Sequence, residues 1–407
     1  MRIPTNFPQK KIIGILLASL AAMTFDISKV IAAPLGDLPP VTIGLSAEFG
    51  HKSSTSAQAI EMGILTALHE INKRGGVLGG RELTLQTHDN RSVPARGVAH
   101  LIQMSQDSDV VAVFGGKFSP VMLEMAPVAN QYEMPLLDPW AAADAIVDNG
   151  GQPNYVFRLS LKDNWALPTM IRYARENGWM RVGLLLPNTG WGRSSEAAAL
   201  SALKHSPKMT LTSTIWYNWG DKNLFDLYGA MLSGGADAIL MVANESEGAQ
   251  FVKAAATYPT SVRIPIVSHW GITGGDFTSL TGKDLEIVEL SVVQTFTFVG
   301  RKDTKTEEVL AIAKLLFGIE SYADIPSATG FANAYDLAHI LANAIDIAGS
   351  TDRRKIRDGL EKVQNYRGLI RNYPQPFSPH SHEALDQSDI IIGRFRADGT
   401  LEPVTKD

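Results

Sequence analysis

Apolar residues recur along this chain in two rhythms, one typical of strands and one typical of helices. From residue 41, "VTIGLSA" predicts a strand, and "SAQAIEMGILTALHEINKRGG" predicts a helix that ends at the paired glycines. The exchange continues through "RELTLQTHDN", "VPARGVAHLIQMSQ", "DVVAVFGG", "SPVMLEMAPVANQYE" and "MPLLDPW". Strands that alternate with helices over short connections predict a parallel, doubly wound sheet with helices on both faces.

The rhythm starts again after "NYVFRLS" and runs from "NWALPTMIRYARENG" to "IPIVSHWG". Strands are predicted at "RVGLLLPN", "MTLTSTIWYN" and "DAILMVAN", with helices between them. The remainder predicts a strand in "VELSVVQTF", then three helices, then two late strands near "YRGLI" and "SDIIIGRF". We therefore predict an α/β fold of two Rossmann-like lobes with parallel sheets.

The N-terminus has a different pattern. Two lysines precede the short apolar run "IIGILLASLAAM", and the small-residue segment "VIAAP" follows. This order predicts a secretory signal peptide over residues 1–32, with an uncleaved anchor as the alternative. The chain has no cysteine, so we expect neither disulfides nor a lipoprotein anchor, and we predict a periplasmic protein.

Charge and motifs argue against several classes of function. The net charge of −5 is spread along the chain, so a nucleic-acid surface is not indicated. The nine histidines lack ligand spacing, apart from the loop pair His380 and His382, and no metal site is expected. The "GITGG" run lacks a lysine-serine tail, "GVLGG" follows a helix, and no GxSxG elbow occurs. We expect no cofactor, no catalytic residue and no enzyme activity.

Polar and aromatic residues gather where the predicted strands end, which is where open α/β sheets bind their ligands. The strand-end segments are "EFGHKSSTS", "GGKFSP", "DPWAAA", "NTGWG", "NESE" and "SHWG". We predict that Trp140, Trp191 and Trp270 line a pocket, because core positions would lie inside the elements. Trp165 and Trp219 fit a pocket wall and a core equally well.

Several of these polar residues have two interpretations. Ser54 and Thr55 either cap the next helix or receive a ligand anion, and the two roles are compatible. Lys117 either forms an ion pair with a ligand carboxylate or is solvated. Asp138 either binds a cationic ligand group or holds an Asx turn. His269 either donates a hydrogen bond to the ligand or the opposite lobe, or packs.

Two further residues are predicted to be structural. Arg158 is expected to brace the first crossover between the lobes, and Asp163 is expected to be the N-cap of the next helix.

Several blocks resemble a known family in their order along nearly the whole mature chain. They include "EINKRGGVLGGRELTLQTHDNRSVP", "MPLLDPWAAA", "NYVFRLSLKDNWA", "VGLLLPNTGWGRS", "ADAILMVAN" and "FANAYDLAHILANAIDIAGSTDRRKIRDGLEKV". The resemblance is to the type I periplasmic solute-binding proteins of ABC transporters, in the leucine/isoleucine/valine-binding branch. It implies hinged lobes with crossovers near residues 157, 292 and 375. It assigns residues 41–157 and 293–375 to lobe 1, and residues 158–292 and 376–407 to lobe 2.

The resemblance also implies roles for individual residues. Ser119 matches a serine that holds the ligand's carboxylate, and Trp191 matches a tyrosine. The family's threonine in the "DPWAAA" loop is absent here, which leaves backbone N–H groups as donors. Glu245 or Glu247 matches the acid that binds the ligand's ammonium group, although either could complement the helix dipole instead. The predicted ligand-binding residues are Ser54, Thr55, Lys117, Phe118, Ser119, Asp138, Trp140, Ala141, Ala142, Trp191, Asn244, Glu245, Glu247, His269 and Trp270.

The resemblance implies a monomeric receptor that captures a small solute by hinge closure and delivers it to the membrane subunits of an ABC permease. An amino acid or amino-acid-like compound fits the predicted site, and so does a small aromatic or amide solute. The alternative is a sensory binding protein that signals to a membrane kinase or cyclase, since this fold serves both roles.

Overall fold

A computed structural model describes residues 38–52 and 54–404 of the chain. The predicted signal peptide, residues 1–32, lies outside the described residues. So does position 53, which is the first residue of a hydroxyl run over residues 53–56. Among the helices of the described part, none is long and apolar enough to cross a membrane.

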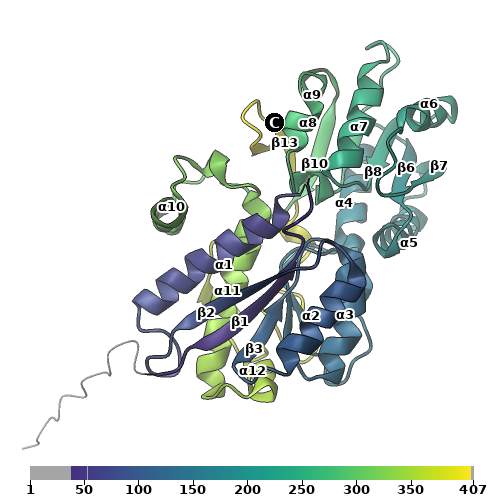
Figure 1. Cartoon of the computed structure of the whole chain (residues 1–407). Coiled ribbons are helices and arrows are strands. Elements are labelled where there is room, and N and C mark those ends of the chain that lie inside the picture. The colour runs from purple at the N-terminus through teal and green to yellow at the C-terminus, as the bar shows by residue number, and fades with distance from the viewer. Residues whose placement is uncertain (1–37, 53, 405–407) are drawn as a thin grey trace, which may run out of the picture. The chain divides into compact units, whose positions relative to one another are not determined.

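The first lobe is built on a sheet of five parallel strands in the order β2-β1-β3-β4-β5 (Figure 1). Strand β1 alternates between its two faces: Ile43 and Leu45 enter the core under α1, whereas Gly44 lies against Met104 of α2. The strands are β1 Val41–Ala47, β2 Leu83–Asp89, β3 Val110–Phe114, β4 Leu136–Asp138 and β5 Val156–Arg158. Strand β5 lies in "NYVFRLS". This segment was not predicted as a strand, so that prediction was incomplete.

Helices cover both faces of this sheet, as the pattern predicted. Helices α1 and α11 pack side by side on one face and α12 packs beside α11, although most of the chain separates α1 from α11 (Figure 1). Helices α2 and α3 cover the other face. The bounds are α1 Ser56–Lys73, α2 Pro94–Ser105, α3 Ser119–Gln131, α11 Ala328–Ala348 and α12 Arg353–Leu360.

The second lobe is built on a seven-stranded sheet in the order β14-β13-β10-β9-β8-β6-β7. In β6, Leu184 and Leu186 enter the core under α4 and α5, whereas Leu185 enters the core under α6 and α7. The strands are β6 Arg181–Pro187, β7 Thr210–Tyr217, β8 Ala238–Met241, β9 Ile266–Ser268, β10 Leu290–Gln294, β13 Ile391–Phe395 and β14 Leu401–Pro403. The helices are α4 Asp163–Glu176, α5 Gly190–Lys204, α6 Phe225–Ser233 and α7 Glu245–Ala256.

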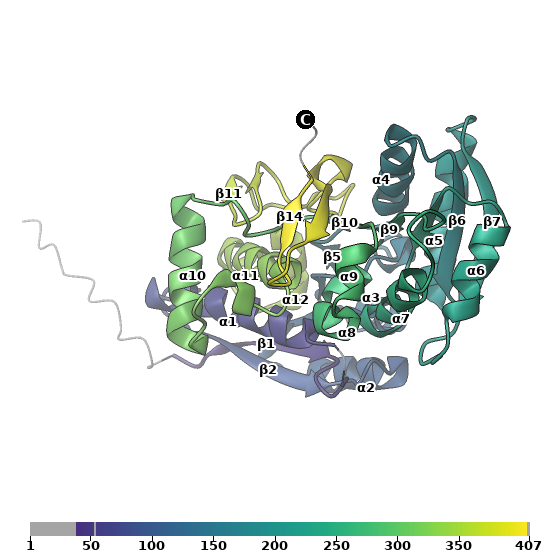
Figure 2. The same cartoon turned by 90° about the horizontal axis from the view of Figure 1, so that it is seen from above.

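The edge of this second sheet departs from the predicted parallel order. Strand β13 pairs with β10 in antiparallel fashion, and β14 pairs with β13 in the same way. Figure 2 shows these yellow C-terminal strands beside β10. An antiparallel neighbour needs no crossover helix on the sheet, so the last segment of the chain can simply add strands to the edge.

The chain passes between the two sheets after β5, after β10 and before β13. The lobe boundaries given from the sequence stay a prediction. The shorter elements flank these passages: α8 Phe277–Thr281, α9 Asp284–Ile287, α10 Thr304–Phe317, β11 Tyr366–Arg367 and β12 Asn372–Tyr373, with 3-10 turns η1 Asp144–Ile146, η2 Trp270–Thr273, η3 Tyr322–Asp324 and η4 Gln387–Asp389.

Candidate functional site

The loops that follow β3, β4, β6, β8 and β9 converge on one small pocket. It contains about 240 Å³ of empty space. Its lining residues come from both lobes: Lys117, Phe118, Ser119, Trp140, Ala142, Trp191, Trp219, Asn244, Trp270 and Gly271. The structure therefore brings together eight of the residues that were predicted to bind a ligand.

A buried ion pair joins the two lobes beside this pocket. Lys117 Nζ, in the loop before α3, donates to Glu245 Oε2 at the start of α7 over 2.6 Å. The side chains are only 2% and 1% exposed. The solvated alternative for Lys117 is therefore wrong. Of the two acids that matched the family's ammonium site, the structure places Glu245 at the interlobe contact, whereas Glu247 accepts a hydrogen bond from the N–H of Gly220 at 2.9 Å.

Gly274 leaves room for the side chain of Lys117 to reach Glu245 in the opposite lobe. A Cβ atom at this position would lie 2.7 Å from Lys117 Nζ, closer than side-chain carbons approach other atoms. The same residue contacts the first lobe through its carbonyl, which accepts from Ser54 Oγ at 3.0 Å and from the N–H of Thr55 at 2.8 Å. The "GITGG" run thus forms part of the contact between the lobes.

The hydroxyl run before α1 takes part in this interlobe contact. Thr55 occupies the N-cap position of α1, but its side chain makes no capping hydrogen bond. Ser54 Oγ also lies 2.6 Å from Ser56 Oγ, which donates to the carboxylate of Glu48. Burial raises the pKa of Glu48, while the nearby charge of Lys117 opposes that shift. Ser54 and Thr55 do not line the pocket, and their predicted role as an anion site stays a prediction.

The "DPWAAA" loop after β4 is held by two side chains of the first lobe. Asp138 Oδ1 accepts from the N–H groups of Trp140 at 3.0 Å and Ala141 at 2.7 Å, which is the Asx turn of the two predicted alternatives. Ser119 Oγ accepts from the N–H groups of Ala142 and Ala143, both at 3.2 Å. In this structure the N–H groups of Ala141 and Ala142 donate within the chain, and their predicted donation to a ligand stays a prediction.

Asp138 carries an unusual charge environment. Its side chain is fully buried, and Oδ2 has no hydrogen-bond partner among residues 38–52 and 54–404. Burial raises the pKa of Asp138 to about 7, although the positive charge of Arg158 opposes that shift. The carboxyl group therefore changes charge near neutral pH.

Two indole rings from opposite lobes meet at the pocket. The ring centroids of Trp140 and Trp270 are 5.7 Å apart. Trp140 also packs on α11 at Gly330, where a Cβ atom would lie 2.2 Å from the indole ring. Trp140 Nε1 is buried and has no hydrogen-bond partner among the described residues. Both rings line the pocket and are also buried members of the hydrophobic core, and their predicted role as a wall against a ligand stays a prediction.

Behind Trp191, a polar cluster orders the second lobe. Asp163 Oδ1 accepts from Trp191 Nε1 at 3.2 Å and from Ser195 Oγ at 3.1 Å, and it lies 3.1 Å from His269 Nε2. His269 is fully buried against Trp191 and is not among the residues that line the pocket. The predicted role of His269 as a ligand donor stays a prediction.

The prediction that Asp163 is an N-cap is wrong. Lys162 is the N-cap of α4, and Asp163 is the first helical residue. Its carboxylate is turned toward the Trp191 cluster instead of the helix N-terminus, because the indole and serine donors lie there.

Four features of the site were missed or left undecided by the sequence analysis. Trp219 lies in the pocket wall and packs edge-on against Phe118, with ring centroids 5.2 Å apart, whereas Trp165 lies under Lys162. Gly271 and Gly274 are needed for close approach, and only the glycine-rich run hinted at them.

Arg158 forms a second buried ion pair, at the hinge rather than at the pocket. Its guanidinium donates to both oxygens of Glu383, at 2.8 and 2.6 Å, and also to the carbonyls of Ala141 and Ala143. The backbone joins the same segments, because the N–H of Arg158 donates to His382 and its carbonyl accepts from Ala384. These contacts agree with the predicted structural role of Arg158.

Comparisons with known proteins agree with this geometry. The chain is 24% identical over 328 residues to the Leu/Ile/Val-binding protein BraC3 of Rhizobium johnstonii, which covers 79% of this chain and 84% of that protein. Two solved structures share the fold. The branched-chain amino acid transporter substrate-binding protein LivJ of Streptococcus pneumoniae, in complex with isoleucine, matches with a TM-score of 0.74 at 20% identity, over 90% of this chain and 99% of that one.

The second structure is a solute-binding protein of an ABC transporter from R. palustris, in complex with 4-hydroxybenzoate. It matches with a TM-score of 0.75 at 15% identity, over 90% of this chain and 96% of that one. A family model described as periplasmic binding protein matches residues 40–399. The chain therefore belongs to the periplasmic binding protein family, and it has the fold of the type I proteins.

Proposed function

We propose that this protein is a periplasmic receptor that closes its two lobes on a small carboxylate and delivers it to an ABC permease. Membership of the solute-binding family supports the general role, and a pocket lined from both lobes supports capture by closure. Recognition needs no covalent step. Because the ligand contacts both lobes only when they are closed, its binding shifts the population toward the closed form.

The observation that carries the choice of ligand is the Lys117–Glu245 ion pair. By resemblance, the acid at the start of α7 binds the ammonium group of an amino acid. Here the ammonium group of Lys117 already sits on Glu245 over 2.6 Å inside the chain. A second ammonium group at this acid would meet a like charge in a buried site, which is unfavourable. We therefore infer that the preferred solute has a carboxylate but no α-amino group.

The other groups of the pocket suit such a solute. A hydroxyl group that accepts two N–H bonds keeps its own hydrogen for donation, so Ser119 is able to donate to a carboxylate oxygen. Lys117 supplies the positive charge among the residues that line this pocket. The indoles of Trp140, Trp191 and Trp270 offer flat apolar surfaces for a planar or branched body. The relatives solved with isoleucine and with 4-hydroxybenzoate show that the fold accommodates both kinds of body.

Titration calorimetry with matched ligand pairs tests this proposal. The pairs are leucine with 4-methylpentanoate and phenylalanine with 3-phenylpropanoate, and 4-hydroxybenzoate is added as an aromatic acid. We expect the amino-free member to bind at least about tenfold more tightly, a difference of about 1.4 kcal/mol. The variant Lys117→Ala should reverse the preference, because it frees Glu245 for a ligand ammonium group. Tighter binding of the amino acids to the wild-type chain contradicts the proposed ligand class.

Two further measurements separate the parts of the proposal. Small-angle scattering should show a smaller radius of gyration when the preferred carboxylate saturates the protein, and an unchanged radius contradicts closure. Deletion of the gene that encodes this protein should abolish cellular uptake of the labelled carboxylate. Uptake that persists, while a cellular response to the solute disappears, assigns the protein to sensing instead of transport.

A further inference from the structure

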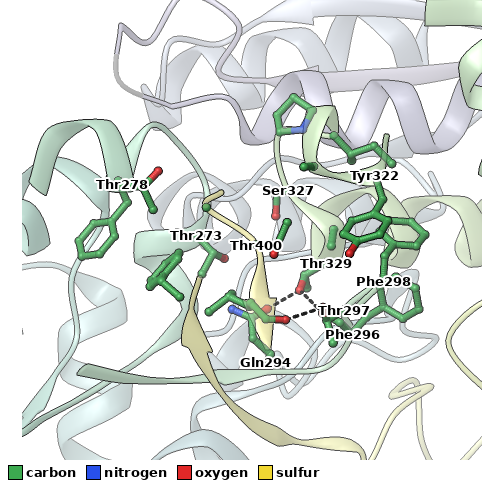
Figure 3. Close-up of a pocket in the computed structure, with 18 of the residues that line it drawn as sticks. Thr273, Thr278, Gln294, Phe296, Thr297, Phe298, Tyr322, Ser327, Thr329 and Thr400 are labelled. Atoms are coloured by element: carbon green, nitrogen blue, oxygen red, sulfur yellow. Dashed lines mark hydrogen bonds between the residues drawn. The ribbon is translucent and has the colours of Figure 1, made fainter. Parts of the chain in front are cut away.

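A second, larger pocket lies beside the tryptophan-lined site, where the end of β10 and the β13–β14 edge meet the start of α11 (Figure 3). It contains about 590 Å³ of empty space, part of which is open to solvent. None of its lining residues lines the tryptophan site. The two pockets are neighbours in the fold: Gly330 and Gly274 pack against Trp140 and Lys117 of the tryptophan site, and they adjoin Thr329 and Thr273 of the second pocket.

The wall of this second pocket contains both aromatic rings and hydroxyl groups. Phe296 and Phe298 pack edge-on with centroids 4.8 Å apart, and Phe277 stacks on Phe395 at 5.1 Å. Hydroxyl groups come from Thr273, Thr278, Thr297, Ser327, Thr329 and Thr400. The lining residues include no Asp, Glu, His, Lys or Arg. Since a charge buried without a counter-charge is costly, the pocket suits an uncharged molecule.

Gln294, the last residue of β10, offers a specific donor to such a molecule. It is 1% exposed, and its Oε1 accepts a hydrogen bond from Thr329 Oγ1. Its Nε2 has no hydrogen-bond partner in the part of the chain that the structure describes. In Figure 3 this nitrogen points away from Thr329, toward the side of the pocket where Thr273 lies. A buried amide N–H without a partner is rare in folded proteins, so it indicates a missing acceptor.

The N-terminus of α11 adds a second set of donors at the same pocket. This helix runs over 21 residues, and its cap residue Ser327 and first two residues, Ala328 and Thr329, line the pocket. The first N–H groups of a helix point outward and favour an acceptor oxygen.

We propose that this pocket is a second binding site, for a small, uncharged, largely apolar molecule that carries one carbonyl oxygen. The amide nitrogen of Gln294 donates to that oxygen, and the phenylalanine rings pack against the apolar body. Since Thr273 and Phe277 follow β9 of the second lobe and Ser327 begins a helix of the first, the bound molecule contacts both lobes.

The test uses three probes of similar shape on the full chain: benzamide, benzoate and toluene. Binding is followed by NMR titration of methyl-labelled threonine residues, several of which line the pocket. We expect benzamide to shift the signals of Thr273 and Thr329, and toluene and benzoate to bind there more weakly. The variant Gln294→Met keeps the length of the side chain but removes the donor, so it should weaken benzamide about tenfold or more.

Two variants control the result. Asp109→Asn lies at an exposed position outside both pockets and should leave the affinity for benzamide at the second pocket unchanged. Ala328→Leu narrows the second pocket without touching Gln294 and should also weaken benzamide, which keeps the test decisive if Gln294→Met folds poorly. Absence of shifts at the pocket threonines with benzamide, or equal affinity in wild type and Ala328→Leu, overturns the proposal. Neither outcome bears on carboxylate binding at the tryptophan site.

Discussion

Two ion pairs among the buried ones of the described residues, Arg158–Glu383 and Lys117–Glu245, are alike in burial and opposite in construction. Arg158 and Glu383 meet through a two-bond fork, and the guanidinium also holds two carbonyls of the "DPWAAA" loop. Lys117 and Glu245 meet through a single-point hydrogen bond from Lys117 Nζ to Glu245 Oε2, between different lobes. A fork with several partners fixes one geometry, whereas a flexible lysine with a single partner can separate when the lobes open. The first pair therefore acts as a brace, and the second as a contact that a ligand can replace.

The largest expected effect is loss of the brace. Arg158→Met should lower the free energy of unfolding by about 3–5 kcal/mol, because it leaves the Glu383 carboxylate buried beside fewer positive charges. Urea unfolding followed by circular dichroism measures the loss. The matched control is Arg394→Met, whose partner Glu289 is half exposed, and it should change stability by less than about 1 kcal/mol. Equal losses in the two variants contradict the assignment of Arg158 as a brace.

Loss of the interlobe contact should have a smaller effect on folding and a clear effect on closure. Lys117→Met should lower the free energy of unfolding by about 1–3 kcal/mol, since Glu245 regains water once the lobes part. The radius of gyration without ligand should rise, because the closed form loses its ion pair. The double variant Lys117→Met/Glu245→Met removes both charges and should recover most of the lost stability. A double variant that is no more stable than Lys117→Met shows that the two side chains are not coupled.

Asp138 tests the Arg158 ion pair in a second way, because the positive charge of Arg158 opposes the rise in the pKa of Asp138 that burial causes. The pKa of Asp138 in the folded chain is about 7, above its ordinary value of 3.8, so the folded state binds more protons than the unfolded state between these values. The free energy of unfolding should therefore fall as pH rises from about 4 to 7. The contribution is about 1 kcal/mol for each pH unit. Asp138→Asn should flatten this fall, and the exposed Asp109→Asn should follow the wild type. Unfolding in urea at pH 5 and pH 8 decides the matter.

The smallest expected effect is at Gly274, which packs against Lys117 of the Lys117–Glu245 ion pair. Gly274→Ala places a methyl group against the end of the Lys117 side chain, which is able to move aside. We expect a loss of about 0.5–1 kcal/mol in unfolding free energy and a partial weakening of carboxylate affinity. The control Gly393→Ala meets no atom closer than 3.4 Å and should change neither quantity. If Gly274→Ala weakens carboxylate affinity as much as Lys117→Met does, the added methyl group prevents Lys117 from reaching Glu245.

Much of the fold was predictable because periodicity reports which face of an element is buried. The helix pattern of "GFANAYDLAHILANAIDIAG" gave α11 almost to its ends, and "RVGLLLPN" gave β6. Periodicity does not report the direction of a strand relative to its neighbours, so it could not predict the antiparallel pairing of β13 and β14. Strand β5 was missed, although β4 and β9, which are equally short, lie within segments that were predicted as strands.

The candidate site was predictable in its location but not in its pairing. The strand-end rule brought Ser119, Trp140 and Trp270 to one pocket, because it depends only on the order of elements. The bond between Lys117 and Glu245 joins residues far apart in the chain, and no local pattern selects one acid over its neighbour two residues on. The second pocket was invisible for the same reason, since Gln294 and Thr329 meet only after the chain has folded.

The indole pair described above gives this protein an optical reporter of its own. Because Trp140 and Trp270 belong to different lobes and their rings lie 5.7 Å apart, their electronic transitions interact only while the lobes are together. Near-ultraviolet circular dichroism and fluorescence therefore record lobe separation without any label. A stopped-flow trace of this signal, with Trp270→Phe as the blank, follows each opening and closing in real time.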